Sequence, residues 1–142
     1  MTTKEYLRQI RIIDRRIDRK TDEVNRLKEV AVNIGMDMTK ERVQTSGTKD
    51  RVGNSATAIV DAEKEALRYI GEYLDLRTKI ISQINSLEKP SHSDILYLRY
   101  VKGLHYKEIA EDLSYSEMHV YRTHSDALAA FEAQFGSTYL ES

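Results

Sequence analysis

Four side chains near the start of one predicted helix are spaced so that they could contact a ligand together. Glu117, Met118, Tyr121 and Arg122 are offset by one, four and five residues, which places them on one face of an α-helix. An arginine donates two parallel hydrogen bonds, and Met and Tyr offer apolar surface, which suits the edges of base pairs in a DNA major groove. Arg122 is the one permanent cation of the set, so each copy reads little sequence by itself.

Two short helices joined by a tight turn must position this face. A helix-turn-helix needs a small residue where its helices cross, apolar neighbours, and an apolar residue of the second helix that packs back on the first. The segment "YKEIAEDLSYSEMHVYRTHSDALAAF" fills each position. The predicted core is Ile109, Ala110 and Leu113 from the first helix with Val120 and Leu128 from the second, and Ser116 caps the second helix after a turn at Ser114 and Tyr115.

The residues that we expect to contact DNA surround that second helix. They are Tyr115, Ser116, Glu117, Met118, His119, Tyr121 and Arg122, with Lys102 and Lys107 as phosphate ligands. The other tyrosines of this segment, Tyr97, Tyr100 and Tyr106, fit a core position with a hydrated hydroxyl. Residues 91–136 hold four Lys/Arg against seven Asp/Glu. We therefore expect a shallow salt dependence of DNA binding, unless the basic N-terminal helix also touches DNA.

The composition and two apolar stripes predict an all-α protein with two long helices before this segment. Charged residues are 32% of the chain, and there is one Pro and no Trp, which favours long solvated helices. The stripes alternate steps of three and four or recur every seven residues, as in helices that pack along each other. We expect an antiparallel hairpin or coiled coil, with a connecting loop at residues 35–55 and self-association through these helices. The stripes are Tyr6, Ile10, Ile13, Ile17, Val24, Leu27, Ala31 and Ile34, then Ile59, Ala66, Tyr73, Ile80 and Leu87.

A boundary is predicted where "LEKPSHSD" separates the long helices from the rest of the chain. Pro90 is expected to end the preceding helix, and Ser91 with Asp94 to cap the next, which runs from about residue 93 to 102. Gly103 can supply the left-handed conformation that ends that helix. The predicted division is a helical oligomerisation region at residues 1–88, a hinge at 89–92 and a helix-turn-helix domain at 93–136.

The sequence does not predict catalysis, a metal site or a cofactor. No two of the four histidines are three or four residues apart, there is no HExxH, and there is no GxxxxGK[ST] or GxGxxG motif. There is no cysteine, so a disulfide or a thiolate nucleophile is excluded. The N-terminus is charged and amphipathic, unlike a signal peptide, and we expect neither export nor a membrane span.

The helix-turn-helix segment resembles a known module. "SDILYLRYVKGL" followed by "HYKEIAEDLSYSEMHVYRTHSDALAAFE", about His92 to Glu132, is similar to region four of bacterial sigma factors. With its paired helices and its "RVQTSGTKDRV" loop, the chain as a whole resembles small phage and prophage transcriptional regulators of Firmicutes, of the ArpU and RinA type. The resemblance implies sequence-specific binding to double-stranded DNA, activation of late phage genes and function in the cytoplasm of a bacterial host. It also makes RNA polymerase a candidate partner.

Two other functions remain open from the sequence. A small terminase subunit also joins a helix-turn-helix to an oligomerising helical region, and it would form a ring and stimulate a packaging ATPase. An adapter that binds RNA polymerase without contacting DNA would leave no footprint on DNA.

Overall fold

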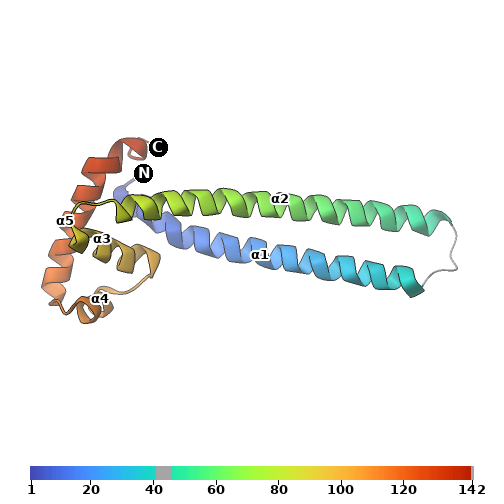
Figure 1. Cartoon of the computed structure of the whole chain (residues 1–142), viewed down its shortest axis with the longest axis horizontal. Coiled ribbons are helices and arrows are strands. Elements are labelled where there is room, and N and C mark those ends of the chain that lie inside the picture. The colour runs from blue at the N-terminus through green and yellow to red at the C-terminus, as the bar shows by residue number, and fades with distance from the viewer. Residues whose placement is uncertain (41–45, 142) are drawn as a thin grey trace. The chain divides into compact units, whose positions relative to one another are not determined.

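Every regular element in the described part of this computed structural model is a helix, which confirms the predicted all-α fold (Figure 1). The structure describes the backbone of residues 1–40 and 46–141 and the side chains of residues 1–35 and 56–141. The elements are α1 (Thr3–Lys40), α2 (Ser46–Asn85), α3 (Pro90–Leu96), the π-helix η1 (Tyr97–Val101), α4 (Tyr106–Leu113), α5 (Glu117–Phe135) and the 3₁₀-helix η2 (Gly136–Thr138).

The chain divides into two compact units. One contains Met1–Asp14 together with Leu74–Ser142, and we call it the terminal unit. The other, Arg15–Tyr73, is the hairpin unit. The terminal unit thus joins the helix-turn-helix segment to the first turns of α1 and the last turns of α2. Independent folding of residues 93–136, which the predicted division implies, stays a prediction.

A capping box fixes the start of α1. The Thr2 hydroxyl accepts a hydrogen bond from the Glu5 amide at 3.2 Å, and the Glu5 carboxylate accepts one from the Thr2 amide at 2.7 Å. This reciprocal pair satisfies two amides that a helix start leaves unbonded. The hydrogen bond from the Thr2 amide is the main reason that the pKa of Glu5 is lowered. The sequence "TTKE" carried this signal.

The core of the terminal unit is built from all its helices. Leu7 and Ile10 of α1 and Ile80 and Ile84 of α2 are fully buried, and the Tyr6 hydroxyl donates to the Gln83 side chain at 2.7 Å. Further buried residues of the same cluster come from α3 to η2: Ile95, Leu96, Leu98, Tyr100, Val101, Ile109, Ala110, Val120, Ala127, Phe131 and Tyr139. The two long helices therefore form part of the platform on which the C-terminal helices pack.

In the hairpin unit α1 and α2 pack through the predicted stripes. Val24 and Ala66 are buried, and the Lys20 ammonium lies 4.9 Å from the centre of the Tyr69 ring. Figure 1 shows the two helices side by side, as predicted for a hairpin. No helix in the described ranges has the length and apolar character needed to cross a membrane.

The long helices extend further than predicted. α1 continues to Lys40 and α2 begins at Ser46, so most of the expected loop at residues 35–55 is helical, and its middle, residues 41–45, lies outside the described residues. The prediction of a loop relied on Gly35, Gly47 and Gly53 and on the lack of a sustained hydrophobic period in this stretch. A glycine inside a helix costs only about 1 kcal/mol relative to alanine, and the surrounding residues favour helix.

The role predicted for Pro90 is also wrong. α2 ends at Asn85, and Pro90 is the first residue of α3. Proline suits this position because its fixed φ is helical and a first-turn amide needs no partner. Lys89 is the N-cap, without a side-chain hydrogen bond, so the predicted cap by Ser91 and Asp94 does not form.

The helix expected at residues 93–102 is two elements. α3 passes into a π-helical turn over Tyr97–Val101, closed by a hydrogen bond from the Lys102 amide to the Tyr97 carbonyl at 3.1 Å. Gly103 then adopts a φ of 72°, and the Leu104 amide bonds to the Leu98 carbonyl at 3.0 Å, so the predicted left-handed stop is confirmed. The wider turn brings Tyr100 and Val101 into the core.

Candidate nucleic-acid interface

A helix-turn-helix core holds α4 against α5. Ile109 and Val120 are fully buried and Ala110 is 7% exposed, so the small residue lies at the crossing. Leu113 and Leu128 are partly buried and pack against the same cluster. The positions that the sequence predicted for this core therefore face inward.

The turn between the helices has a left-handed residue that is not glycine. Ser114 has a φ of 57° and is the C-cap of α4. The Tyr115 amide donates to the Ala110 carbonyl at 2.9 Å, which satisfies a carbonyl at the end of α4. Ser116 then caps α5, since its hydroxyl oxygen accepts from the His119 amide at 3.1 Å. This local geometry points the start of α5 outward.

The predicted reading face is exposed. Met118 is 62% and Tyr121 49% exposed, and Glu117, His119 and Arg122 are also at the surface. Within the described part of the chain, no carboxylate lies within ion-pair distance of the Arg122 guanidinium. Its donors are thus available to a ligand.

Two aromatic pairs fix side chains beside this face. The rings of Tyr115 and His119 lie 4.1 Å apart, so His119 is turned towards the turn. Tyr121 lies 4.8 Å from Tyr106, the first residue of α4. The predicted ligands Tyr115 and Tyr121 are therefore placed by ring contacts.

Sequence reasoning missed Tyr106 and Arg99. The Arg99 guanidinium lies 4.4 Å from the centre of the Tyr106 ring and donates to the Leu104 carbonyl at 2.8 Å. Tyr106 in turn contacts Tyr121. The sequence periodicity does not predict the contact between Arg99 and Tyr106, because that contact depends on the path of residues 102–105. Arg99 thus brings a permanent positive charge close to the reading face.

A buried polar pair supports α5 from behind. The Tyr100 hydroxyl and the His124 Nε2 are 2.9 Å apart, and His124 is only 4% exposed. Burial, together with the positive charges of Lys4, Arg99 and Arg8, lowers the pKa of His124 to about 4. Burial also raises the pKa of Tyr100 to about 12. Both groups are therefore neutral at pH 7, as a buried pair requires.

The two predicted phosphate ligands are exposed but separate. Lys102 follows η1, and Lys107 lies in the first turn of α4. No contact joins either ammonium to the exposed face of α5 among the described side chains. Lys107 shares α4 with the exposed carboxylates of Glu108, Glu111 and Asp112.

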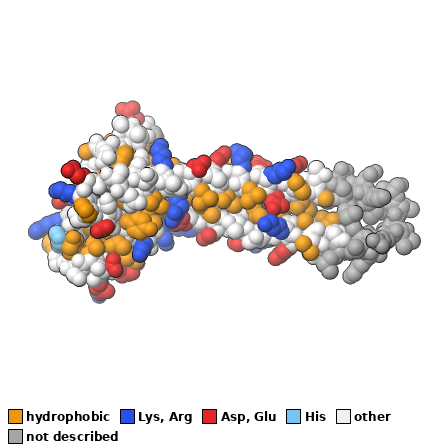
Figure 2. Space-filling view, in the orientation of Figure 1, with side chains coloured by type: hydrophobic (Ala, Val, Ile, Leu, Met, Phe, Trp, Pro, Cys, Tyr) orange, Lys and Arg blue, Asp and Glu red, His pale blue; other side chains and the backbone are white. Residues whose placement is uncertain are grey.

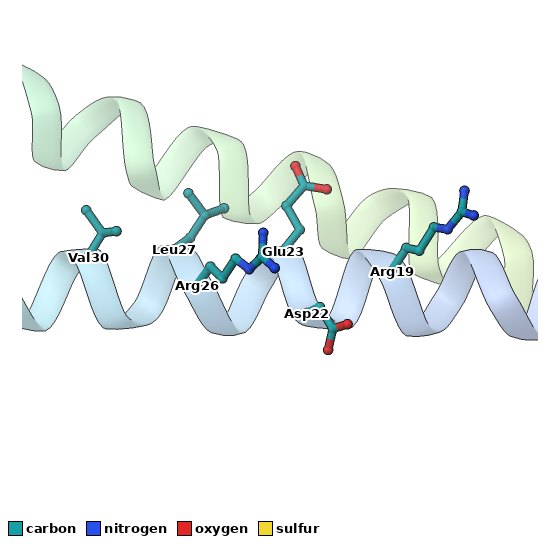
Figure 3. Close-up of a pocket in the computed structure, with 6 residues that line it drawn as sticks. All are labelled: Arg19, Asp22, Glu23, Arg26, Leu27 and Val30. Carbon is teal, nitrogen blue, oxygen red and sulfur yellow. The ribbon is translucent and has the colours of Figure 1, made fainter.

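Other surfaces of the described chain offer weaker sites. A hollow of about 450 Å³ on the hairpin unit is lined by Arg19, Asp22, Glu23, Arg26, Leu27 and Val30, all from α1 (Figure 3). Asp22 points away from the side on which Leu27 and Val30 lie. Its mixed charges do not converge on one enclosed position, as a small-molecule site would require. Among the residues described, no three His, Cys, Asp or Glu side chains are grouped to hold a metal ion.

Comparison with known families supports the helix-turn-helix. Residues 89–130 match the family model of Sigma-70, region 4. The match covers under a third of the chain and spans α3, η1, α4 and most of α5. It confirms the predicted likeness to sigma region four in this segment. No curated protein and no solved structure matches the chain, and the likeness to phage regulators stays a prediction.

Proposed function

We propose that this chain is a sequence-specific DNA-binding transcriptional regulator, without catalytic activity, that reads a major groove with the first two turns of α5. The observation that carries the proposal is an exposed reading face, Glu117 to Arg122, on a helix-turn-helix that matches sigma region 4. A major groove admits an α-helix, and Arg122 can bond a guanine while Met118 and Tyr121 offer apolar contact to thymine methyls. The Ser116 hydroxyl can still donate to a phosphate, since its oxygen is the capping acceptor.

Selection from a random duplex library at physiological salt tests this proposal. We expect the wild type to enrich a defined motif and Arg122→Ala to lose preference at one position by about 1–3 kcal/mol, roughly five-fold to 150-fold. Arg26→Ala, an exposed arginine of the hairpin unit, is the matched control and should select the wild-type motif. Failure of the folded wild type to enrich any motif would reject sequence-specific binding.

The biological setting is part of the proposal. The resemblance of the whole chain to small phage and prophage regulators supports activation of late phage genes in the cytoplasm of a bacterial host. Reporter expression from a late phage promoter carrying the selected motif, with and without the chain, measures that activity. Repression or no change would remove the activator role while leaving DNA binding intact.

A second function has support in one feature of the reading face. Met118, at 62% exposure, is the most exposed of the large apolar side chains described, and an exposed methionine also suits a protein surface. An adapter that binds RNA polymerase alone would co-purify with the polymerase and protect no DNA. A footprint that Arg122→Ala abolishes would decide for the first function.

We also propose that the regulator is a homo-oligomer paired through its N-terminal helices. Val60, Leu67 and Leu74 of α2 recur every seven residues and are 48%, 50% and 46% exposed. Figure 2 shows apolar side chains along a face of the hairpin, with charged side chains at its edges. Glu63 and Lys64 flank the stripe on opposite sides, so a second copy packed in parallel would pair unlike charges. Two copies would double the sequence that one Arg122 reads.

A further inference from the structure

The first turns of α1 carry a row of cations. Lys4, Arg8 and Arg11 follow each other at steps of four and three, so they lie on one face, and all three are exposed. Leu7 and Ile10, on the neighbouring face, are fully buried in the core of the terminal unit. The row is therefore held in place by the same core that holds α4 and α5.

Arg11 reaches the connection between η1 and α4. Its Nη1 donates to the Val101 carbonyl at 3.5 Å. A Cβ on Gly103 would lie 2.9 Å from the Arg11 guanidinium carbon. The guanidinium thus lies directly on the backbone at Gly103, which follows the exposed Lys102.

Arg99 extends the positive charge towards the reading face. It stacks on Tyr106, and Tyr106 contacts Tyr121. Besides burial, the positive charges of Lys4 and Arg8, like that of Arg99, help to lower the pKa of the His124 imidazole in α5. Cations from two distant parts of the sequence, the start of α1 and η1, therefore act on the same buried residue of α5.

These cations form no close ion pairs with carboxylates. Among the side chains that the structure describes, Lys4, Arg8, Arg11, Arg99 and Lys102 make no ion pair. Two acids of the same unit have hydrogen-bond partners of their own: Glu5 accepts from the Thr2 amide and Glu132 from the Thr3 hydroxyl. Besides the hydrogen bond from the Thr2 amide, the charge of Arg8 also acts on Glu5 and helps to lower its pKa. On the side of the terminal unit seen in Figure 2, charged side chains of both signs lie among apolar ones. The five cations thus have no close ion pair, although residues 91–136 carry more acids than bases.

We infer that five cations form one phosphate-binding surface, which contacts the DNA backbone beside the groove that α5 reads. They are Lys4, Arg8, Arg11, Arg99 and Lys102. The inference rests on the proposed function and adds the N-terminal helix to the DNA interface. Phosphate contacts fix the register of a protein on a duplex and supply most of its sequence-independent affinity. The helix-turn-helix alone offers few cations for this purpose.

The salt dependence of binding tests the surface. The double variant Arg8→Gln/Arg11→Gln is compared with Arg19→Gln/Arg26→Gln, which removes the same charge from exposed positions of α1 in the hairpin unit. Each duplex, the one recovered by selection and one of mixed sequence, is titrated at several salt concentrations. We expect the slope of log K against log salt to become shallower by about 2 for the first variant only, at about 0.9 per lost phosphate contact. Affinity should fall by the same factor on both duplexes.

A conservative pair separates phosphate binding from a structural role. Arg8→Lys/Arg11→Lys keeps both charges but loses the planar guanidinium that packs on Gly103, and it should retain the wild-type slope. The phosphate surface would be refuted if the wild type binds DNA and Arg8→Gln/Arg11→Gln has the same salt slope as the wild type. The proposed function would still stand. Equal losses in both Gln double variants would also overturn the phosphate surface, since the effect would then be one of net charge. If the wild type binds neither duplex, the proposed function itself is rejected, and the phosphate surface with it.

Discussion

At the scale of single residues, His124 shows how a titratable group becomes structural. It is held neutral between Tyr100 and Tyr106, and its pKa is about 4 in the folded chain against 6.5 for the free side chain. As the pH falls below 6.5, the His124 side chain therefore takes up a proton in the unfolded chain but stays neutral in the folded chain. The stability that this histidine contributes is complete above pH 6.5 and is lost as the pH falls towards 4.

We predict that this loss is visible as a difference between variants. Between pH 6.5 and 4.5 the free energy of unfolding of the wild type should fall more steeply than that of His124→Phe, by up to about 1.4 kcal/mol per pH unit, the value for one proton. Urea unfolding at a series of pH values measures both slopes. His105→Gln, which changes an exposed histidine, should follow the wild type. Parallel slopes for wild type and His124→Phe would show that His124 protonates freely in the folded chain.

The sequence predicted single residues well where their roles are local. The cap at Ser116, the small Ala110 and the inward Val120 follow from spacing along one or two helices. The stacking of Arg99 on Tyr106 and the hydrogen bond of Tyr100 to His124 could not be predicted in this way. They depend on a π-helical turn and on the path of residues 102–105, which no period in the sequence encodes.

At the scale of elements, the turn of the helix-turn-helix stores backbone strain. Ser114 adopts the left-handed conformation, which costs a residue with a Cβ about 1–2 kcal/mol. The Ser114 side chain is exposed. The effect of this residue on the free energy of unfolding is therefore set by its backbone conformation.

We expect Ser114→Gly to stabilise the chain by about 1 kcal/mol, because glycine adopts this conformation without a steric cost. Thermal or urea unfolding gives the difference in free energy. The control is Ser125→Gly, an exposed position inside α5, which should destabilise by about 0.5 kcal/mol. A loss of stability in Ser114→Gly would mean that the hydroxyl, rather than the backbone, holds the turn.

The sequence predicted which segments are helical better than it predicted the residues at which each helix begins and ends. The stripes gave both long helices, and Gly103 gave the stop after η1. The start of α3 and the extent of α1 and α2 were missed because proline and glycine were both taken as helix breakers. Proline fits the first turn of a helix, and a long helix tolerates a glycine such as Gly71, whose Cβ position is open.

At the scale of the whole molecule, the proposed self-association rests on the exposed stripe on α2. The double variant Val60→Gln/Leu67→Gln should shift the sedimenting species from an oligomer to a monomer, since it removes two half-exposed apolar side chains from the proposed contact. Val32→Gln, at a position that is 61% exposed on α1, is the matched control and should leave the mass unchanged. Sedimentation of the wild type as a monomer at all concentrations would refute pairing through this surface.

The joining of residues 1–14 to residues 74–142 in one unit has a consequence for biosynthesis. The Thr3 hydroxyl is hydrogen-bonded to the Tyr139 hydroxyl at 2.9 Å across 136 positions of sequence, and Tyr6 stacks on Tyr139 at 4.2 Å. Residues 15–73 can pair as a hairpin while synthesis continues, and this pairing shortens the loop that must later close. The terminal unit, however, lacks part of its core until Tyr139 has left the ribosome. The nascent chain should therefore remain unable to hold α5 firmly until Tyr139 has emerged.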